Sequence, residues 1–180
     1  MSWNTAEAHA LLFGIRRSVR YHDRRVAHFE LLHRATSFTT VLLAGIVIVD
    51  LLAKPDLFAI KAFAAFAAIL GAVDLIVGFS RRAGEHRDFK QRFIALEQRM
   101  IRRDASDSVD GIRLDRLTIE AEEPPVFRAL DGLCHNELLV AQGYSRDDPD
   151  EARHFKRIPT HKRLTAHLLK WPDLAARTRP

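Results

Sequence analysis

Cysteine is almost absent from this sequence of 180 residues, which contains only Cys134. One cysteine excludes an internal disulfide, and this agrees with a chain whose bulk lies in the cytoplasm. Metal-binding patterns of the HExxH, CxxC and HxH types are also absent, although the chain has nine histidines. We therefore expect no metal site and no cofactor.

Catalytic signatures are missing as well. The sequence has no glycine-rich phosphate loop, no GxSxG elbow and no paired-carboxylate signature. Cys134 and His135 are neighbours, and on a helix their side chains point about 100° apart, which makes a poor nucleophile–base pair. These absences argue against an enzyme. Nucleic acid is not an expected partner either, because acidic residues are interspersed with the basic ones and no binding motif occurs.

Charge is scarce in two stretches, residues 36–53 and 62–80, which hold one charged residue each, Asp50 and Asp74. As helices they are roughly 27–29 Å long, close to the bilayer hydrocarbon thickness of about 30 Å. The alternative is a pair of buried helices in a soluble all-α domain, but 180 residues offer little protein to cover two helices that are apolar on all sides. We therefore predict an all-α protein with a two-span transmembrane hairpin in the lipid bilayer.

Positive charge is concentrated outside this hairpin. The connection between the stretches carries only Lys54 and Lys61. The flanks carry Arg16, Arg17, Arg20, Arg24, Arg25 and Arg34 on one side, and Arg81, Arg82, Arg87, Lys90 and Arg92 on the other. Because positive residues stay on the cytoplasmic side, we expect a multi-pass protein of the cell (inner) membrane with both termini in the cytoplasm. The same flanks suit anionic lipid head groups.

Two apolar stripes continue the hairpin on its cytoplasmic side. Each stripe steps by three and four residues, the seam pattern of packed helices. The first comprises Leu12, Ile15, Val19, Val26 and Phe29, with His22 and His33 at the remaining positions, and the second comprises Ala83, His86, Phe89, Phe93, Leu96 and Met100. We predict an antiparallel helical stalk in which Val26 lies near Phe89, Val19 near Leu96 and Ile15 near Met100.

Short cytoplasmic helices follow the stalk. Residues 104–111 are typical of a turn, residues 112–122 predict a helix with Leu114, Leu117 and Ala121 on one side, and two prolines stop it and start the next. That next helix is predicted over 126–142 with Gly143 as its cap, then an extended segment over 144–159 and a last helix over 160–170. The predicted organisation is therefore a basic amphipathic helix (1–35), the hairpin (36–80), cytoplasmic helices (81–144) and a C-terminal extension (145–180).

Asp50 and Asp74 are the candidate pore or gating residues. An ionisable residue in a membrane span is costly, so it normally faces protein or water. Asp50 lies about one turn from the outer end of its span and has an interfacial alternative, pairing with Lys54. Asp74 lies two turns from the inner end, and its alternative is to extend toward Arg81 and Arg82. We expect Asp74 to serve function or assembly.

Small residues in the second span predict assembly. Ala67, Gly71 and Gly78 share a face with Asp74, and such residues let helix backbones approach closely in lipid. The alternative is packing inside the hairpin, against Gly45 and Val49. Two spans alone cannot enclose water, so any pore requires a homo-oligomer.

Histidine is the last candidate group. His22, His33 and His86 lie on the stalk seam, where they could form a proton-sensitive joint. The alternative is that they are partly solvated packing residues.

One segment resembles a known family. The layout of two spans with a short outer loop, followed by the series Glu-Pro-Pro, Ala-Leu-Asp and His-Asn-Glu, resembles the SLATT family over about residues 10–144. That name denotes two-span effector domains associated with bacterial nucleotide-signalling and SLOG sensor systems. The motif residues are Glu123, Pro124, Asp131, Asn136 and Glu137.

The resemblance implies a pore-forming or membrane-perturbing effector in antiphage defence, released by a nucleotide-signalling or sensor partner. Any trigger would act through the cytoplasmic helices or through a separate partner. The other function that we weigh is a membrane-anchored adaptor whose cytoplasmic helices recruit a partner without conduction. The motif carboxylates and Asn136 suit a clamp between helices, and the alternative is that they are ordinary surface residues.

Overall fold

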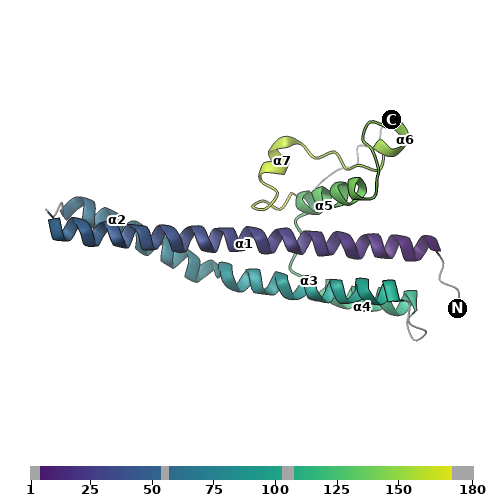
Figure 1. Cartoon of the computed structure of the whole chain (residues 1–180), viewed down its shortest axis with the longest axis horizontal. Helices are drawn as coiled ribbons and strands as arrows, with labels where there is room; N and C mark the ends of the chain where they lie inside the picture. Colours follow the sequence, from purple (N-terminus) through teal and green to yellow (C-terminus); the bar gives the residue numbers. More distant parts are fainter. Residues whose placement is uncertain (1–4, 54–56, 103–107, 172–180) are drawn as a thin grey trace. The chain divides into compact units, whose positions relative to one another are not determined.

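The computed structural model describes residues 5–53, 57–102 and 108–171, except for the side chains of residues 5, 50, 51, 53 and 57. Within these residues the chain is all-helical and has no strand, which confirms the predicted class. The helices are α1 (Thr5–Ala53), α2 (Leu57–Val77), α3 (Phe79–Arg102), α4 (Val109–Glu122), α5 (Arg128–Ala141), α6 (Pro149–Ala152) and α7 (Thr160–Leu164), as Figure 1 shows.

Contacts divide the chain into two compact units. Unit 1 comprises residues 1–24 and 87–180, and unit 2 comprises residues 25–86. Helix α1 supplies residues to both units, and so does α3.

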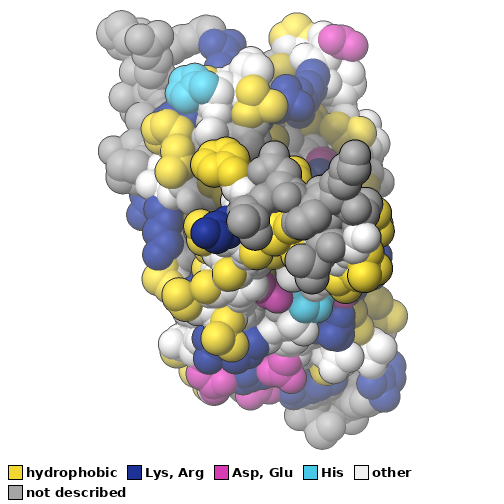
Figure 2. All heavy atoms as spheres, turned by 90° about the vertical axis from the view of Figure 1, so that its left-hand side faces the viewer, with side chains coloured by type: hydrophobic (Ala, Val, Ile, Leu, Met, Phe, Trp, Pro, Cys, Tyr) yellow, Lys and Arg dark blue, Asp and Glu magenta, His cyan; other side chains and the backbone are white. Residues whose placement is uncertain are grey.

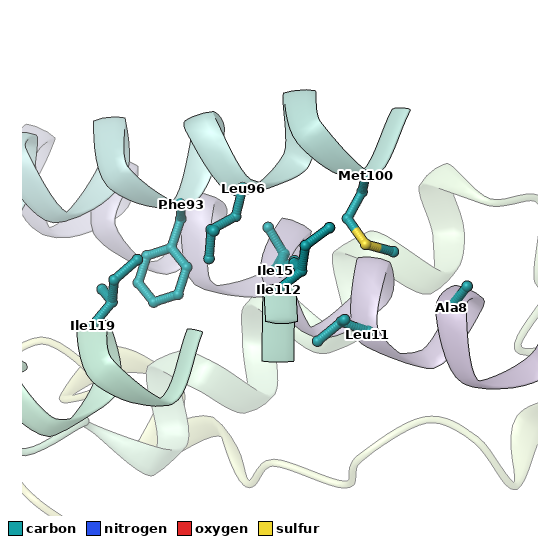
Figure 3. Packing of buried hydrophobic residues seen from close by; sticks show 8 residues of the cluster. All are labelled: Ala8, Leu11, Ile15, Phe93, Leu96, Met100, Ile112 and Ile119. Carbon is teal, nitrogen blue, oxygen red and sulfur yellow. The ribbon is translucent and has the colours of Figure 1, made fainter. Parts of the chain in front are cut away.

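The core of unit 1 is built from the two predicted stripes together with α4. Figure 3 shows this cluster of Ala8, Leu11, Ile15, Phe93, Leu96, Met100, Ile112 and Ile119, on which Leu12, Val19, Phe89 and Val109 pack. Two of the predicted stalk pairs, Val19 with Leu96 and Ile15 with Met100, therefore belong to one cluster. The third pair, Val26 with Phe89, joins the two units and stays a prediction.

Helix α4 turns a different face to the core from the one predicted. Leu114 and Leu117 are exposed, and Ile112 and Ile119 are buried instead. The helix also begins earlier, at Val109, because the Ser108 hydroxyl accepts a hydrogen bond of 3.0 Å from the Gly111 amide and caps its first turn. Gly111, predicted in a turn, is thus helical, and residues 103–107 lie outside the described residues. A short helix with apolar residues on two faces leaves the choice of face to its neighbours.

Helix α5 starts at Arg128, two residues later than predicted, because Pro125, Val126 and Phe127 remain non-helical. Its C-terminus carries the predicted glycine cap: Gly143 has φ +92°, its amide donates to Val140, and the Tyr144 amide donates to Leu139. This pair of bonds satisfies carbonyls of the last turn, and a left-handed φ favours glycine there.

The C-terminal extension differs from the prediction in two respects. A short helix, α6, occupies part of the segment predicted to be extended, because the Asp148 carboxylate accepts from the Asp150 amide and Pro149 suits the first helical position. Helix α7 ends at Leu164 rather than near residue 170.

In unit 2 the second apolar helix is shifted and interrupted relative to the prediction. Helix α2 begins at Leu57 and ends at Val77, and Gly78 separates it from α3 with a φ of +64°. The backbone bonds continue across this residue, from the Gly78 amide to Asp74 (2.7 Å) and from the Arg82 amide to Gly78 (2.9 Å). The predicted continuous helix therefore contains one left-handed residue, a conformation that glycine adopts without strain.

The two apolar helical stretches leave most of their side chains uncovered. Each is long and apolar enough to cross a membrane. Only 6% of the most apolar 18-residue stretch in each is buried. Figure 2 faces the end of the molecule where α1 meets α2 and shows hydrophobic side chains on the surface. The exposed residues include Val41, Ile48, Val49, Leu52, Phe58, Leu75 and Ile76. A core helix of a soluble protein would be mostly buried, so this composition and exposure support a membrane protein.

Candidate functional site

Asp74, the candidate pore residue, contacts a histidine of the other apolar helix. In unit 2 its Oδ2 lies 3.2 Å from Nδ1 of His33, which is located in α1. Both side chains are partly exposed. In such a pair the Nδ1–H of the imidazole donates to the carboxylate, and a proton on both ring nitrogens would turn the bond into an ion pair.

The second carboxylate oxygen of Asp74, Oδ1, differs from the first. Oδ1 is buried and accepts no hydrogen bond from any residue that the structure describes. Arg81 and Arg82, the partners weighed from the sequence, bind elsewhere: Arg82 Nε donates to the Val77 carbonyl at 3.0 Å, and Arg81 lies 3.8 Å from Glu85. Asp74 therefore depends on His33, with capacity for one further donor or cation.

The His33 contact also bears on the depth of Asp74. His33 precedes the first apolar stretch, which begins at Thr36, and the Thr36 hydroxyl donates back to the carbonyls of Leu32 (2.9 Å) and His33 (3.0 Å). A side chain in contact with His33 lies level with the polar start of that stretch. Asp74 consequently lies at the polar end of the apolar region, beside the start of the first apolar stretch, rather than in its middle.

An aromatic cluster lies beside this end of unit 2. Phe29, Phe79 and Ala83 form its buried part. The guanidinium carbon of Arg25 lies 4.5 Å from the centre of the Phe29 ring, and His86 stacks on the same ring at 5.7 Å with an interplanar angle of 14°. Cation–π contacts let a buried arginine keep its charge close to apolar residues.

Two of the three seam histidines are buried, which contradicts the alternative that they are partly solvated. His86 lies in the aromatic cluster of unit 2, and His22 is fully buried in unit 1. The His22 ring stacks on Phe89 (5.4 Å) and Phe93 (5.6 Å), and its Nε2 hydrogen-bonds to the Glu123 carboxylate. Only His33 is partly solvated.

The acidic motif residues contact basic residues of α1 within unit 1. Glu123 binds His22, Asp131 pairs with Arg17 at 2.9 Å, and Glu137 pairs with Arg24. The three α1 partners are Arg17, His22 and Arg24, spaced five and two residues apart. These contacts tie the Pro-Pro segment and α5 to α1, as a clamp between helices would. Pro124 itself is exposed.

Asn136 makes the most specific contact of the motif. Its Nδ2 donates to the Lys156 carbonyl and its Oδ1 accepts from the Lys156 amide, both at 2.8 Å. The side chain is buried, so the amide replaces a backbone partner for the chain after α6. Lys156 Nζ in turn lies 3.5 Å from Asp131. Asn136 is thus a structural residue.

The small residues of α2 have different surroundings. Gly71 is exposed and has no atom within 4 Å of the place where a Cβ would stand, and the same holds for Gly45 in α1. Ala67 is partly exposed. The alternative that these residues pack inside the hairpin is therefore not what the structure shows at Gly71. Gly78 has another role, because it interrupts the helix.

Cys134 and His135, weighed above as a nucleophile–base pair, have other surroundings. Burial raises the pKa of the Cys134 thiol to about 12, so the thiolate is not accessible at neutral pH. His135 Nε2 donates to the His154 carbonyl (3.0 Å). In the described part of the chain no group of three His, Cys, Asp or Glu side chains could hold a metal. The side chain of Asp50 lies outside the described residues.

Sequence reasoning missed His33 as the partner of Asp74. It also missed Tyr21, whose hydroxyl accepts a hydrogen bond of 3.1 Å from the Phe127 amide. The position of His33 on the seam was a signal that it faces the second helix. Tyr21 had no comparable signal, since it lies between the stripe positions Val19 and His22.

Comparison of the chain with known protein families, curated proteins and solved structures finds no match.

Proposed function

We propose that this chain is a multi-pass protein of the cell (inner) membrane, with a transmembrane hairpin and both termini in the cytoplasm. The observation that carries the proposal is that only 6% of the most apolar 18-residue stretch in each of the two helical regions is buried. Transfer of such helices into lipid removes apolar side chains from water, and a helix satisfies its own backbone groups there. The arginine-rich flanks set the orientation.

Cysteine labelling tests this topology. We expect an Asp56→Cys variant to react with a membrane-impermeant maleimide from outside the cell, and a Gln91→Cys variant to react only after the membrane is opened. The native Cys134 gives little background because it is buried with a raised pKa. Labelling of Asp56→Cys from the cytoplasmic side alone would show that the orientation is wrong.

The packed stripes of unit 1 support an antiparallel stalk that continues the hairpin. Ile15 and Val19 share one cluster with Phe93 and Leu96. If the pairing continues across the boundary between the units, a Val26→Cys/Phe89→Cys double variant forms a disulfide on oxidation. A Val26→Cys/Leu114→Cys pair serves as the control, since Leu114 is exposed on α4. Equal cross-linking of both pairs would contradict the stalk.

We further propose that the protein assembles into a homo-oligomeric pore or membrane-perturbing effector. The open surface around Ala67 and Gly71 supports close approach of another helix, and several copies are needed to enclose water. By the SLATT resemblance, the biological setting is antiphage nucleotide-signalling defence, with a sensor protein as the partner that triggers opening.

Asp74 has a specific role in this proposal. In the closed protomer its carboxylate is held by His33, and in the open oligomer a ring of carboxylates favours cations. Asp74→Asn keeps the size and removes the charge. We expect this variant to assemble normally in detergent but to lose cation preference in liposomes and toxicity on expression. If Asp74→Asn conducts and kills like the parent while Asp74→Leu does not assemble, Asp74 is an assembly contact.

A membrane-anchored adaptor is the second candidate. It is favoured by the His33–Asp74 contact, because a carboxylate engaged within its own protomer does not need a water-filled axis. Liposome conductance of the purified oligomer separates the two candidates. An oligomer that never conducts, with or without a trigger, supports the adaptor.

A further inference from the structure

Residues 153–171, the basic segment, have charge of one sign. The segment contains six lysines and arginines and three histidines, and it contains no aspartate or glutamate. It includes α7 and the chain before and after this helix.

The arginines of the basic segment differ from the other arginines of unit 1. Arg153, Arg157 and Arg163 are exposed, and none has an ion-pair partner in the part of the chain that the structure describes. Elsewhere in unit 1 the arginines are commonly paired with carboxylates, as for Arg17, Arg24, Arg92 and Arg99. The positive charge here is therefore available to an external anion.

Three leucines of the basic segment are also turned outward. The exposed fractions are 80% for Leu164, 66% for Leu168 and 49% for Leu169. Single exposed leucines are common on soluble proteins, but three within six residues form an apolar surface among the positive charges of the basic segment.

The leucines are exposed because other residues of the basic segment pack against unit 1. Ala166, between the leucines, is fully buried with Tyr21, Leu130 and Cys134. Trp171 Nε1 donates to the Thr165 hydroxyl (3.1 Å), and Lys162 Nζ lies 5.2 Å from the Trp171 ring. Ala166 packs into the core cluster, and the Lys156 backbone is hydrogen-bonded to Asn136. These contacts fix the side of the segment that faces the core, and the three leucines lie on the other side.

We propose that the basic segment is a docking surface for an anionic lipid leaflet. Its leucines enter the boundary between head groups and acyl chains, while Arg157, Arg163 and Lys170 contact lipid phosphates. Lipid explains both features at once, because a nucleic acid would use the arginines but leave the aliphatic side chains in water. The proposal is independent of whether the spans conduct.

Trp171 fluorescence tests the proposal in the full chain. The sequence has only two tryptophans, so a Trp3→Phe variant makes Trp171 the sole reporter. The variant is reconstituted into vesicles of phosphatidylcholine, alone or mixed with phosphatidylglycerol, with bromine atoms on the acyl chains near the head group. We expect at least about twofold stronger quenching of Trp171 in the anionic vesicles, and weaker quenching at high salt because salt screens the attraction.

Matched variants show whether the quenching of Trp171 comes from binding of the basic segment to lipid or only from its closeness to the membrane. Leu164→Ser/Leu168→Ser should abolish the additional quenching, and Arg157→Gln/Arg163→Gln should reduce it. Leu114→Ser/Leu117→Ser removes two comparably exposed leucines from α4 and should leave it unchanged.

Two results would overturn the proposal. Equal quenching in neutral and anionic vesicles means that the positive charge does not bind lipid. Absence of quenching, together with a change in Trp171 emission when RNA or an acidic peptide is added, assigns the surface to one of those polyanions instead.

Discussion

At the residue scale, Asp74, Asn136 and the three motif carboxylates have partners that are remote in the chain. Asp131, Asn136 and Glu137 were identifiable as a group by the resemblance, and their contacts with Arg17, Lys156 and Arg24 were not. A partner depends on the register between two helices, which 3–4 spacing alone does not determine. The same reason explains why His33 was not assigned to Asp74.

His135 gives a prediction of pH dependence. Burial lowers the pKa of His135, against a raising contribution from its hydrogen bond to the His154 carbonyl, and the nearby Lys156 and Arg17 lower it further. The Asp131 carboxylate opposes them by raising the pKa. The folded chain therefore resists protonation at this ring while the unfolded chain accepts a proton near pH 6.5. The stabilisation is present above that pH and is lost as the pH falls toward the lowered folded pKa.

We expect His135→Gln to flatten the decline in thermal stability between about pH 7.5 and 5.5. Circular dichroism of the detergent-solubilised protein at several pH values measures it. A residual decline should remain, because the pKa of His28 is lowered as well, mainly by burial and to a smaller extent by the charge of Arg25. An unchanged slope in His135→Gln would contradict the assignment.

At the element scale, the seam positions were the most predictable feature. Every predicted stripe residue of α3 except Phe89 is buried, because six apolar or aromatic positions at 3–4 spacing leave one face to cover. Helix α4 was predicted with the wrong face, since Leu114 and Leu117 compete with Ile112 and Ile119 for the same role. The break at Gly78 was also missed, because a glycine inside an apolar stretch is equally typical of close packing.

Phe93 and Phe89 provide a matched pair for the seam. Phe93 is fully buried in the core of unit 1, whereas Phe89 is only half-buried against it. We expect Phe93→Ala to lower the free energy of unfolding by about 3–5 kcal/mol and Phe89→Ala to cost clearly less. Denaturant titration in mild detergent compares the two. Equal losses would mean that Phe89 is covered in solution.

Gly78 and Gly84 provide a second matched pair, because an added Cβ should have opposite effects at the two positions. Alanine at this position must adopt the left-handed φ of +64°, so Gly78→Ala should destabilise the protein by roughly 1–2 kcal/mol or straighten the helix. Gly84 lies within α3 with no atom within 4 Å of an added Cβ. Gly84→Ala should therefore stabilise the helix by roughly 0.5–1 kcal/mol. Thermal midpoints of both variants give the sign of each effect, and a stabilising Gly78→Ala would contradict the break.

At the scale of the whole molecule, the helical class and the two long apolar helices were predictable from residue composition. Their low burial agrees with the prediction that little protein is available to cover them. The boundary between the compact units, at residues 24/25 and 86/87, was not predictable, because the two apolar stripes continue across it without a break.

Assembly can be tested with Gly71 and Gly45, which are both open to an added side chain. If α2 forms the contact between protomers, Gly71→Leu should weaken association by about tenfold or more, whereas Gly45→Leu in α1 should leave it unchanged. Light scattering of the purified protein in detergent gives the mass of each variant. Identical masses over a dilution series would exclude the Gly71 face as the contact.

The discontinuity of unit 1 has a consequence for the order of events during synthesis. Its first segment, residues 1–24, leaves the ribosome well before its second segment, residues 87–180. Tyr21 is buried against Leu130, which is translated about 110 residues later, a delay of roughly 5–20 s at 5–20 residues per second. Both apolar helices emerge during this interval. In the topology proposed above, membrane insertion therefore precedes the folding of unit 1, and Tyr21 of α1 stays without its α5 partners during that interval.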